Sequence, residues 1–218
     1  MENIKFLIIG LGSMGKRRIR NLKYLKETNI VGFDITEERR EETKEKYGIK
    51  TVNTIEKAFN ENPNAIIIST PPHLHEDYMK LAIEKNIPFF TELNLISKGL
   101  NKIVKNGNEK NILMASSCDM RYIESIKKIK ELIKNQKIGK VTSFAYHVGQ
   151  YLPDWHPWED YRKFFASRKD TNGCVEVIPG ELNWMEDIFG KITSVMSLNG
   201  KYSDLEIDSP DTYQIILK

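Results

Sequence analysis

The chain has 218 residues, of which 40% are hydrophobic and 29% are charged. This is the composition of a folded protein of one large or two small domains, and it excludes a disordered tail, a collagen-like fibre and a disulfide-rich miniprotein. Lys and Arg number 33 against 30 Asp and Glu, which gives a formal net charge of +3. Because no segment concentrates basic residues as a nucleic-acid surface would, we expect no nucleic-acid partner.

The cysteines and the apolar runs bear on the cellular compartment of the protein and on metal and membrane binding. Cys118 and Cys174 are too few for a disulfide framework, and no HxxH or CxxC spacing indicates a metal site. The N-terminal apolar run ends at Gly10 and is followed by basic residues, which is typical of a first strand and not of a signal peptide. No apolar stretch approaches the roughly 20 residues that span a bilayer. We expect a cytoplasmic protein without metal or membrane partners.

The first half of the chain alternates short apolar runs with charged amphipathic segments. Such alternation predicts βαβ units around a parallel sheet. The expected strands are 4–9, 30–34, 50–52, 65–69, 88–91 and 112–116. Within them, 6–9 and 65–68 are apolar at every position, which indicates central strands covered by helices on both faces.

The pattern changes in the second half. Residues 122–134 carry apolar side chains at helical spacing and predict the last helix before the change. After Gly139 we expect a strand at 141–150, a loop rich in aromatic residues and proline at 151–172, a helix within 176–189, and strands at 192–198 and 212–217. Two or three strands make a small sheet for a second core, so we interpret this part as a truncated domain.

Residues 10–15 read Gly-Leu-Gly-Ser-Met-Gly, a GxGxxG sequence. It follows the first apolar strand and opens a basic helix, and Asp34 stands 19 residues after Gly15 at the end of the second strand. In this motif Gly10 permits a tight turn, Gly12 lets the backbone approach a pyrophosphate, and Gly15 lets the helix pack on the sheet. The alternative is a glycine-rich turn with an incidental aspartate.

The predicted cofactor is NAD. The turn, with Ser13 and Met14, places the pyrophosphate at the N-terminus of the helix, where unpaired N–H groups and the helix dipole favour an anion. Asp34 is expected to accept hydrogen bonds from the adenosine ribose, and its charge repels a 2′-phosphate, so NAD is preferred over NADP. Arg39 and Arg40 follow closely and could weaken that preference.

The fold class is therefore α/β. We expect an N-terminal Rossmann domain with a doubly wound parallel sheet at residues 1–121, which binds NAD(P). A second, truncated α+β sheet domain is expected at residues 122–218, where the substrate site and the oligomer contacts would lie.

Five later segments carry a second set of motifs. They are Ser-Thr-Pro-Pro-His-Leu-His at 69–75, Phe-Thr-Glu at 90–92, Cys-Asp-Met-Arg-Tyr at 118–122, Trp-His-Pro-Trp-Glu-Asp-Tyr-Arg at 155–162, and 181–190. With the glycine turn they resemble the Gfo/Idh/MocA oxidoreductases over essentially the whole chain, from Ile4 to Leu217. The resemblance implies a nicotinamide-binding domain followed by an open-sheet domain with the substrate site.

The resemblance also implies site residues. Thr70, Pro71, His75 and Glu92 would line the cofactor pocket, which agrees with the rule that ligands lie beyond the carboxyl ends of parallel strands. The alternative for His75 is an ordinary surface residue near a helix start. His73 is expected to be exposed.

The chain departs from the family pattern at the acid–base positions. After the Glu the family continues with Lys-Pro, and that Lys helps to deprotonate the reacting hydroxyl, whereas this chain has Leu93 and Asn94. On the later helix the family places a His and, three residues on, an Asp, whereas this chain has Gly180 and Asn183. A positioned acid or base is worth about 10²- to 10⁴-fold in rate, so ordinary sugar dehydrogenation should be weak.

Other side chains could supply these groups or bind the substrate. The available titratable or cationic groups are Tyr146, His147, His156, Tyr161 and Arg162. For each of them packing or surface exposure is the alternative, and alternation along a strand turns Tyr146 and His147 to opposite faces. Trp155 and Trp158 either stack on a sugar ring or fix the loop to the domain. The expected substrate residues are Trp158, Tyr161, Arg162 and Asn183.

Two functions fit these observations. One is an NAD-dependent oxidoreductase that acts on a hydroxyl or carbonyl group of a sugar or sugar derivative. The other is a catalytically silent NAD-binding or partner-binding protein of the same fold.

The last strand, 212–217, leaves backbone groups unpaired, so we expect a homo-oligomer in which a neighbour completes or covers the C-terminal sheet. The alternative is a fragment with a poorly ordered C-terminal half.

Overall fold

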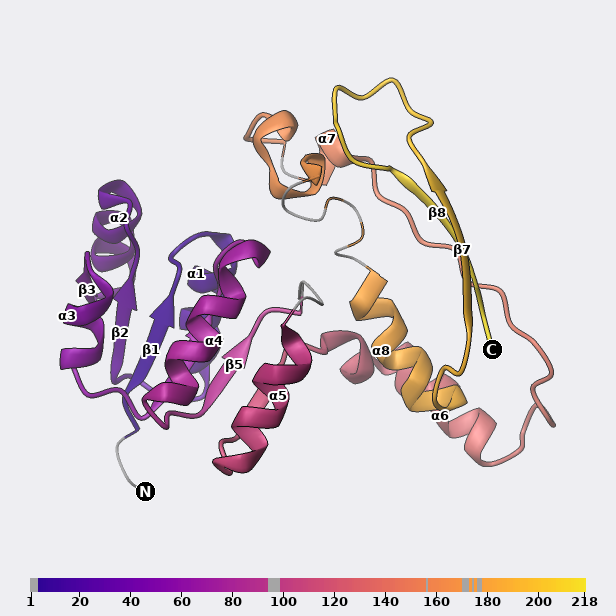
Figure 1. The fold of residues 1–218 in the computed structure, drawn as a ribbon, viewed down its shortest axis with the longest axis horizontal. Helices are drawn as coiled ribbons and strands as arrows, with labels where there is room; N and C mark the ends of the chain where they lie inside the picture. Colours follow the sequence, from indigo (N-terminus) through magenta and orange to yellow (C-terminus); the bar gives the residue numbers. More distant parts are fainter. Residues whose placement is uncertain (1–3, 94–98, 156, 170–172, 174, 176–177) are drawn as a thin grey trace. The chain divides into compact units, whose positions relative to one another are not determined.

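The computed structural model describes residues 4–93, 99–155, 157–169, 173, 175 and 178–218. The chain divides into two compact units, Met1–Ser117 and Cys118–Lys218 (Figure 1). Each unit has a hydrophobic core of its own.

The first unit is built on a six-stranded parallel sheet. Its strands are β1 (Phe6–Ile9), β2 (Ile30–Phe33), β3 (Lys50–Val52), β4 (Ala65–Ile68), β5 (Phe89–Thr91) and β6 (Met114–Ser116). They lie in the order β3-β2-β1-β4-β5-β6, so the winding direction reverses between β1 and β4. This is the doubly wound order of dinucleotide-binding domains, and it confirms the predicted α/β fold.

In the described part of the first unit, α-helices alternate with these strands. They are α1 (Ser13–Tyr24), α2 (Glu37–Tyr47), α3 (Ile55–Asn60), α4 (His75–Glu84) and α5 (Leu100–Glu109), and a 3₁₀ turn, η1 (Pro72–Leu74), leads into α4. Among the helices in the described part of the chain, none is both long enough and apolar enough to cross a membrane.

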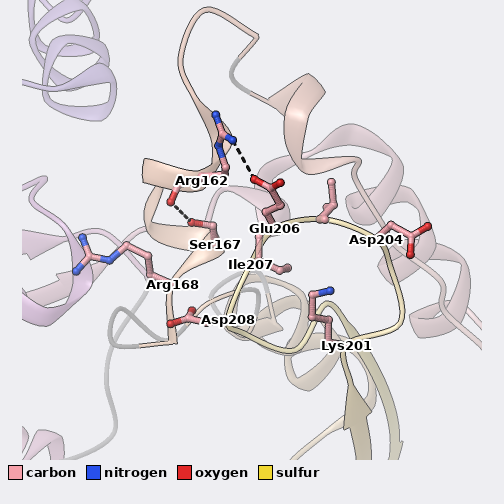
Figure 2. Close-up of a pocket in the computed structure, with 9 residues that line it drawn as sticks. Arg162, Ser167, Arg168, Lys201, Asp204, Glu206, Ile207 and Asp208 are labelled. Atoms are coloured by element: carbon pink, nitrogen blue, oxygen red, sulfur yellow. Dashed lines mark hydrogen bonds and ion pairs between the residues drawn. The ribbon is translucent and has the colours of Figure 1, made fainter.

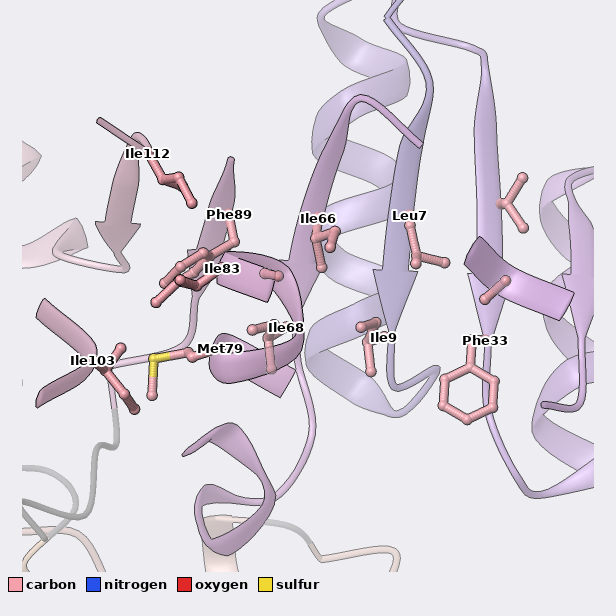
Figure 3. Close-up of a cluster of buried hydrophobic side chains, with 13 residues drawn as sticks. Leu7, Ile9, Phe33, Ile66, Ile68, Met79, Ile83, Phe89, Ile103 and Ile112 are labelled. Carbon is pink, nitrogen blue, oxygen red and sulfur yellow. The ribbon is translucent and has the colours of Figure 1, made fainter. Parts of the chain in front are cut away.

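The central strands are apolar throughout because both of their faces are covered. Leu7 and Ile9 of β1 point into a cluster that includes Met79 of α4 (Figure 3). Ile8, between them, points to the other face, where it joins a cluster with Ile19 of α1. Since successive side chains of a strand face opposite ways, a strand between two helical layers needs an apolar residue at every position.

The second unit is smaller. Its main elements are α6 (Glu124–Lys134), α7 (Leu152–Trp155), α8 (Ile178–Phe189), β7 (Val195–Gly200) and β8 (Thr212–Leu217), with 3₁₀ turns η2 (Asp119–Tyr122), η3 (Tyr161–Lys163) and η4 (Phe165–Ser167). β7 and β8 form an antiparallel pair in which Val195 lies opposite Leu217. The core is a small cluster in which Ile126 of α6 packs with Trp184 and Met185 of α8.

The predicted strand at 141–150 is wrong. In the structure this segment belongs to no strand, and the small sheet contains β7 and β8. Its alternating aromatic residues pack on a helix instead. Phe144 stacks on Phe189 with ring centroids 4.2 Å apart, and Tyr146 meets Trp184 edge-on at 5.3 Å. The alternation in the sequence places Phe144 and Tyr146 on one side of the segment, where they contact α8 without strand pairing and stay partly exposed.

Candidate functional site

The turn between β1 and α1 leaves no room for side chains at two of its glycines. Gly10 has a φ of 92°, and a Cβ there would lie 2.6 Å from the carbonyl oxygen of Ser69. A Cβ at Gly15 would overlap the carbonyl oxygen of Gly10. At Gly12, by contrast, a Cβ would meet nothing within 4 Å. Gly10 and Gly15 are therefore required by the fold, whereas Gly12 borders open space at the start of the helix.

The N-terminus of α1 is suited to an anion. Gly12 is its N-cap without a side-chain cap, and its first turn contains no acidic residue. The first backbone bond of the helix runs from the N–H of Lys16 to the oxygen of Gly12, at 3.0 Å. The N–H groups of Ser13, Met14 and Gly15 have no partner within the helix, and together with the helix dipole they attract negative charge.

Asp34 lies at the rim of this turn, directly after β2. Its buried carboxylate accepts hydrogen bonds from the N–H of Leu11 at Oδ2 and from the N–H of Thr36 at Oδ1, both at 2.8 Å. Arg39 Nη1 is 3.8 Å from Oδ2, whereas Arg40 Nη1 donates to the main-chain oxygen of Asp34 at 2.9 Å. A carboxylate has about four acceptor positions, so the two N–H groups fix it and leave capacity for further donors.

The loop after β4 holds Thr70, Pro71 and His75. His75 is only 1% exposed, and its Nε2 lies 2.7 Å from the oxygen of Thr70. The surface alternative for His75 is therefore wrong, while His73 is exposed as predicted. Oγ1 of Thr70 is buried and has no hydrogen-bond partner among the described residues.

Glu92, after β5, is part of a buried ion pair. It is 8% exposed, and both of its carboxylate oxygens accept hydrogen bonds from Arg18 of α1, at 2.8 and 2.6 Å. Ser69 Oγ adds a third hydrogen bond at 3.1 Å, and the Arg18 guanidinium lies 4.9 Å from the centre of the Phe90 ring. Both carboxylate oxygens of Glu92 are therefore held by protein donors, and its expected contact with the cofactor stays a prediction.

Sequence reasoning missed Arg18 and Ser69. Arg18 stands in a basic run after the glycine turn, and that run indicated only a basic helix. Its partner Glu92 is 74 positions away, so no local pattern could reveal the pair.

The predicted substrate residues of the second unit lie in different surroundings. Arg162 binds Asp160 at 2.8 Å and Glu206 at 2.9 Å, and these hydrogen bonds raise the pKa of its guanidinium. It also lines a hollow of about 540 Å³ (Figure 2). The other three predicted residues, Trp158, Tyr161 and Asn183, do not line that hollow. The four residues are thus not gathered around one cavity.

The aromatic residues of the 151–172 segment also lie in different surroundings, some packed on other rings and some exposed. Trp155 packs edge-on against Phe164 with ring centroids 5.4 Å apart, which supports the interpretation that it fixes the loop. Trp158 is 74% exposed. Tyr161 accepts a hydrogen bond at its hydroxyl from the N–H of Glu206, at 3.3 Å.

Helix α8 carries polar groups close to Tyr146. Trp184 Nε1 donates to Oε2 of Glu181 at 2.7 Å. Burial, and then a hydrogen bond to Glu181, raise the pKa of Tyr146 to about 12, so its hydroxyl stays protonated at neutral pH. Oδ1 of Asn183 is buried without a hydrogen-bond partner among the described residues, and it is therefore an open acceptor.

The remaining acid–base candidates can be placed only in part. His147 is exposed. Leu93 is partly buried, and its N–H donates to Ser117 Oγ at 3.1 Å. Asn94 and His156 lie outside the described residues. Gly180 is part of α8 and brings no side chain.

Comparison with known proteins agrees with the first unit's geometry. Residues 4–95 match a family model described as an oxidoreductase family with an NAD-binding Rossmann fold. The myo-inositol 2-dehydrogenase of Thermotoga maritima is 25% identical over 138 residues, which are 61% of this chain and 41% of that protein. The 2,7-anhydro-N-acetylneuraminate hydratase of Mediterraneibacter gnavus is 23% identical over 203 residues, 92% of this chain and 53% of that protein.

A solved structure has the same fold. The oxidoreductase from Agrobacterium radiobacter in complex with NAD⁺, L-tartaric acid and magnesium superposes with a TM-score of 0.84 at 16% identity. The match covers 99% of this chain and 63% of that one. The chain spans about half the length of the curated relatives that it matches.

Gly15, which is crowded, and Gly12, which borders open space, give a matched pair of variants. Gly15→Ala should lower the free energy of unfolding by about 1–3 kcal/mol or more, because its Cβ overlaps the Gly10 carbonyl. Gly12→Ala should unfold like the wild type, since its Cβ meets open space. Urea denaturation, monitored by circular dichroism, measures the free energy of unfolding of both variants. Equal stability of the two variants would contradict the geometry of the turn.

Proposed function

We propose that this chain, which belongs to the Gfo/Idh/MocA oxidoreductase family through its residues 4–95, is a cytoplasmic NAD-dependent oxidoreductase acting on a hydroxyl or carbonyl group of a sugar or sugar derivative. The observation that carries the proposal is the glycine turn, with open space at Gly12, an uncapped helix start and a fixed carboxylate at Asp34. NAD, when bound, supplies the acceptor or donor of a hydride. The substrate class is supported by the names of the myo-inositol and 2,7-anhydro-N-acetylneuraminate relatives.

The residues of the first unit have separate parts in this proposal. The N–H groups of Ser13, Met14 and Gly15 would hold the pyrophosphate, and Asp34 would accept from the adenosine ribose. Thr70, whose buried Oγ1 has no partner among the described residues, would donate to the cofactor, next to Pro71 and the buried His75. We assign residues 1–121 to this cofactor domain and residues 122–218 to part of the substrate and oligomerisation domain.

The preference for NAD over NADP would depend on the charge beside the adenosine. The Asp34 carboxylate is buried and repels a 2′-phosphate. Of the two arginines that follow, Arg40 donates to the main-chain oxygens of Asp34 and Ile35, and Arg39 lies within ion-pair distance of the carboxylate. Arg39 is thus the cation placed to offset Asp34.

Replacing Asp34 tests this assignment. Asp34→Ala should weaken NAD binding about 10- to 100-fold, the value of hydrogen bonds to a charged group, and should narrow the difference between NAD and NADP. The NAD affinity of Asp34→Asn, which keeps one acceptor oxygen, should fall between that of Asp34→Ala and that of the wild type. Asp77→Ala, at an exposed position of α4, is the control. Calorimetry with both dinucleotides measures the change, and tighter binding of NADP than of NAD by the wild type would refute the role of Asp34.

A second candidate function is a catalytically silent NAD-binding protein. The observation that favours it is the chemistry of Leu93 and Gly180, which offer neither an acid nor a base. The neighbouring alternative, Tyr146, has a pKa of about 12 and is therefore a proton donor and not a base at neutral pH.

Turnover by the wild type distinguishes the two candidates, because NAD binding without turnover favours the silent protein, and restoring a lysine tests whether Leu93 limits the rate. The wild type should oxidise common sugars slowly or not at all, and Leu93→Lys should raise the rate by at least about 10-fold, toward the 10²- to 10⁴-fold of a positioned acid or base. Leu93→Met, similar in size but without charge, is the control. The assay follows the absorbance of reduced nicotinamide. Rapid oxidation by the wild type would show that another residue already carries the proton, and Tyr146, His147 and His156 would then be replaced first.

The small sheet of the second unit supports our proposal of a homo-oligomer. Met196 and Leu198 of β7 and Ile216 of β8 share one face, because Met196 lies opposite Ile216 in the antiparallel pair. All three side chains are about 70% exposed. An apolar face of this kind favours association with a second copy of the chain.

Light scattering tests the oligomer. We expect a dimer or larger assembly that buries more than about 1,000 Å². Leu198→Lys should shift it to monomer, because it places a charge on the shared apolar face. Val195→Lys, on the opposite face of β7, should leave the assembly intact. A monodisperse monomer of the wild type would overturn this part of the proposal.

A further inference from the structure

We propose that Arg18 is a positioning residue for the cofactor, because its guanidinium cancels the charge of the Glu92 carboxylate and so allows a pyrophosphate to approach this edge of the sheet. The inference rests on the proposed NAD binding. It assigns a function to a side chain that makes no predicted contact with the cofactor itself.

The geometry is that of a fixed ion pair. Arg18 donates from Nε and Nη2 to the two different oxygens of Glu92, at 2.8 and 2.6 Å. The side chains are 16% and 10% exposed, so water screens them little. Ser69 donates to the same carboxylate at 3.1 Å. Such a two-point contact of guanidinium and carboxylate fixes both orientation and distance.

The pair joins three elements at one edge of the sheet. Arg18 comes from α1, the helix whose N-terminus would receive the pyrophosphate, while Ser69 follows β4 and Glu92 follows β5. The carboxyl ends of parallel strands meet at this edge, and β1 and β4 are direct neighbours there. A change in the charge of Glu92 is therefore felt where the dinucleotide would bind.

The charge balance at this edge gives Arg18 its role. A pyrophosphate brings two negative charges, and Asp34 and Glu92 are both buried carboxylates. Charges interact more strongly in a partly buried site than in water. Arg18 is always protonated, so it neutralises Glu92 at every working pH. Without Arg18, Glu92 would add a second negative carboxylate, beside that of Asp34, near the ligand.

Other titratable groups at the same edge have different partners. Asp34 is held by the N–H groups of Leu11 and Thr36, and His75 lies on the oxygen of Thr70. His75 is a further titratable group at this edge. The experiment must therefore compare variants that all retain His75.

The experiment compares Arg18→Gln, Glu92→Gln and the double variant by calorimetric titration with NAD at pH 6 and pH 8. Arg18→Gln should bind NAD about 10-fold more weakly at pH 8, because Glu92 is left charged and unpaired. The double variant has no charge at either position, and it should bind within about 3-fold of the wild type at both pH values.

The outcomes separate the inference from the proposed function. If the wild type binds no NAD, the proposed function is wrong. If the wild type binds but the double variant is as weak as Arg18→Gln, the pair is needed for shape and the inference is overturned. Circular dichroism checks folding of each variant. If Arg18→Gln does not fold, the double variant decides, because removing both charges leaves no unpaired buried ion.

Discussion

The first unit depends on the absence of a side chain at Gly15. A Cβ there would overlap the carbonyl oxygen of Gly10, so the helix can approach the end of β1 only with glycine at this position. This close approach brings the uncapped start of α1 to the sheet edge between β1 and β4. One turn later in the helix, it also brings Arg18 within hydrogen-bond distance of Glu92. A single steric constraint thus places both the first N–H groups of α1 and the Arg18–Glu92 ion pair.

The two carboxylates at this edge are held in chemically different ways. Asp34 accepts from backbone N–H groups, which fix its position but do not cancel its negative charge, and the nearest cation, Arg39, lies 3.8 Å from Oδ2. Glu92 accepts from the Arg18 guanidinium, whose positive charge compensates the negative charge of the carboxylate. One carboxylate can therefore recognise hydroxyl groups and repel a 2′-phosphate, while the other has become part of the scaffold. Their residue type alone does not distinguish these roles.

The sequence predicts what depends on local pattern and misses what depends on distant partners. The strands of the first unit were predictable, because two helical layers force an apolar residue at every position of β1 and β4. At 141–150 the alternation indicated an apolar face, but the face packs on α8, and alternation cannot tell a helix from a neighbouring strand. Glu92, the partner of Arg18, and Glu206, one of the two partners of Arg162, stand 74 and 44 positions away, beyond any motif.

The polar side chains around Tyr146 in the second unit bear on proton transfer. In the second unit, Glu181 already accepts from Trp184 and Tyr146, and a tyrosine whose pKa is about 12 keeps its proton throughout the physiological range. Asn183 offers a buried acceptor without the proton affinity of a carboxylate. Tyr146 and Asn183 can orient a hydroxyl, but neither side chain is ready to remove its proton at neutral pH. Under the proposed function, Leu93 and Gly180 would limit the chemical step, whereas the glycine turn and Asp34 of the first unit would still provide for NAD binding.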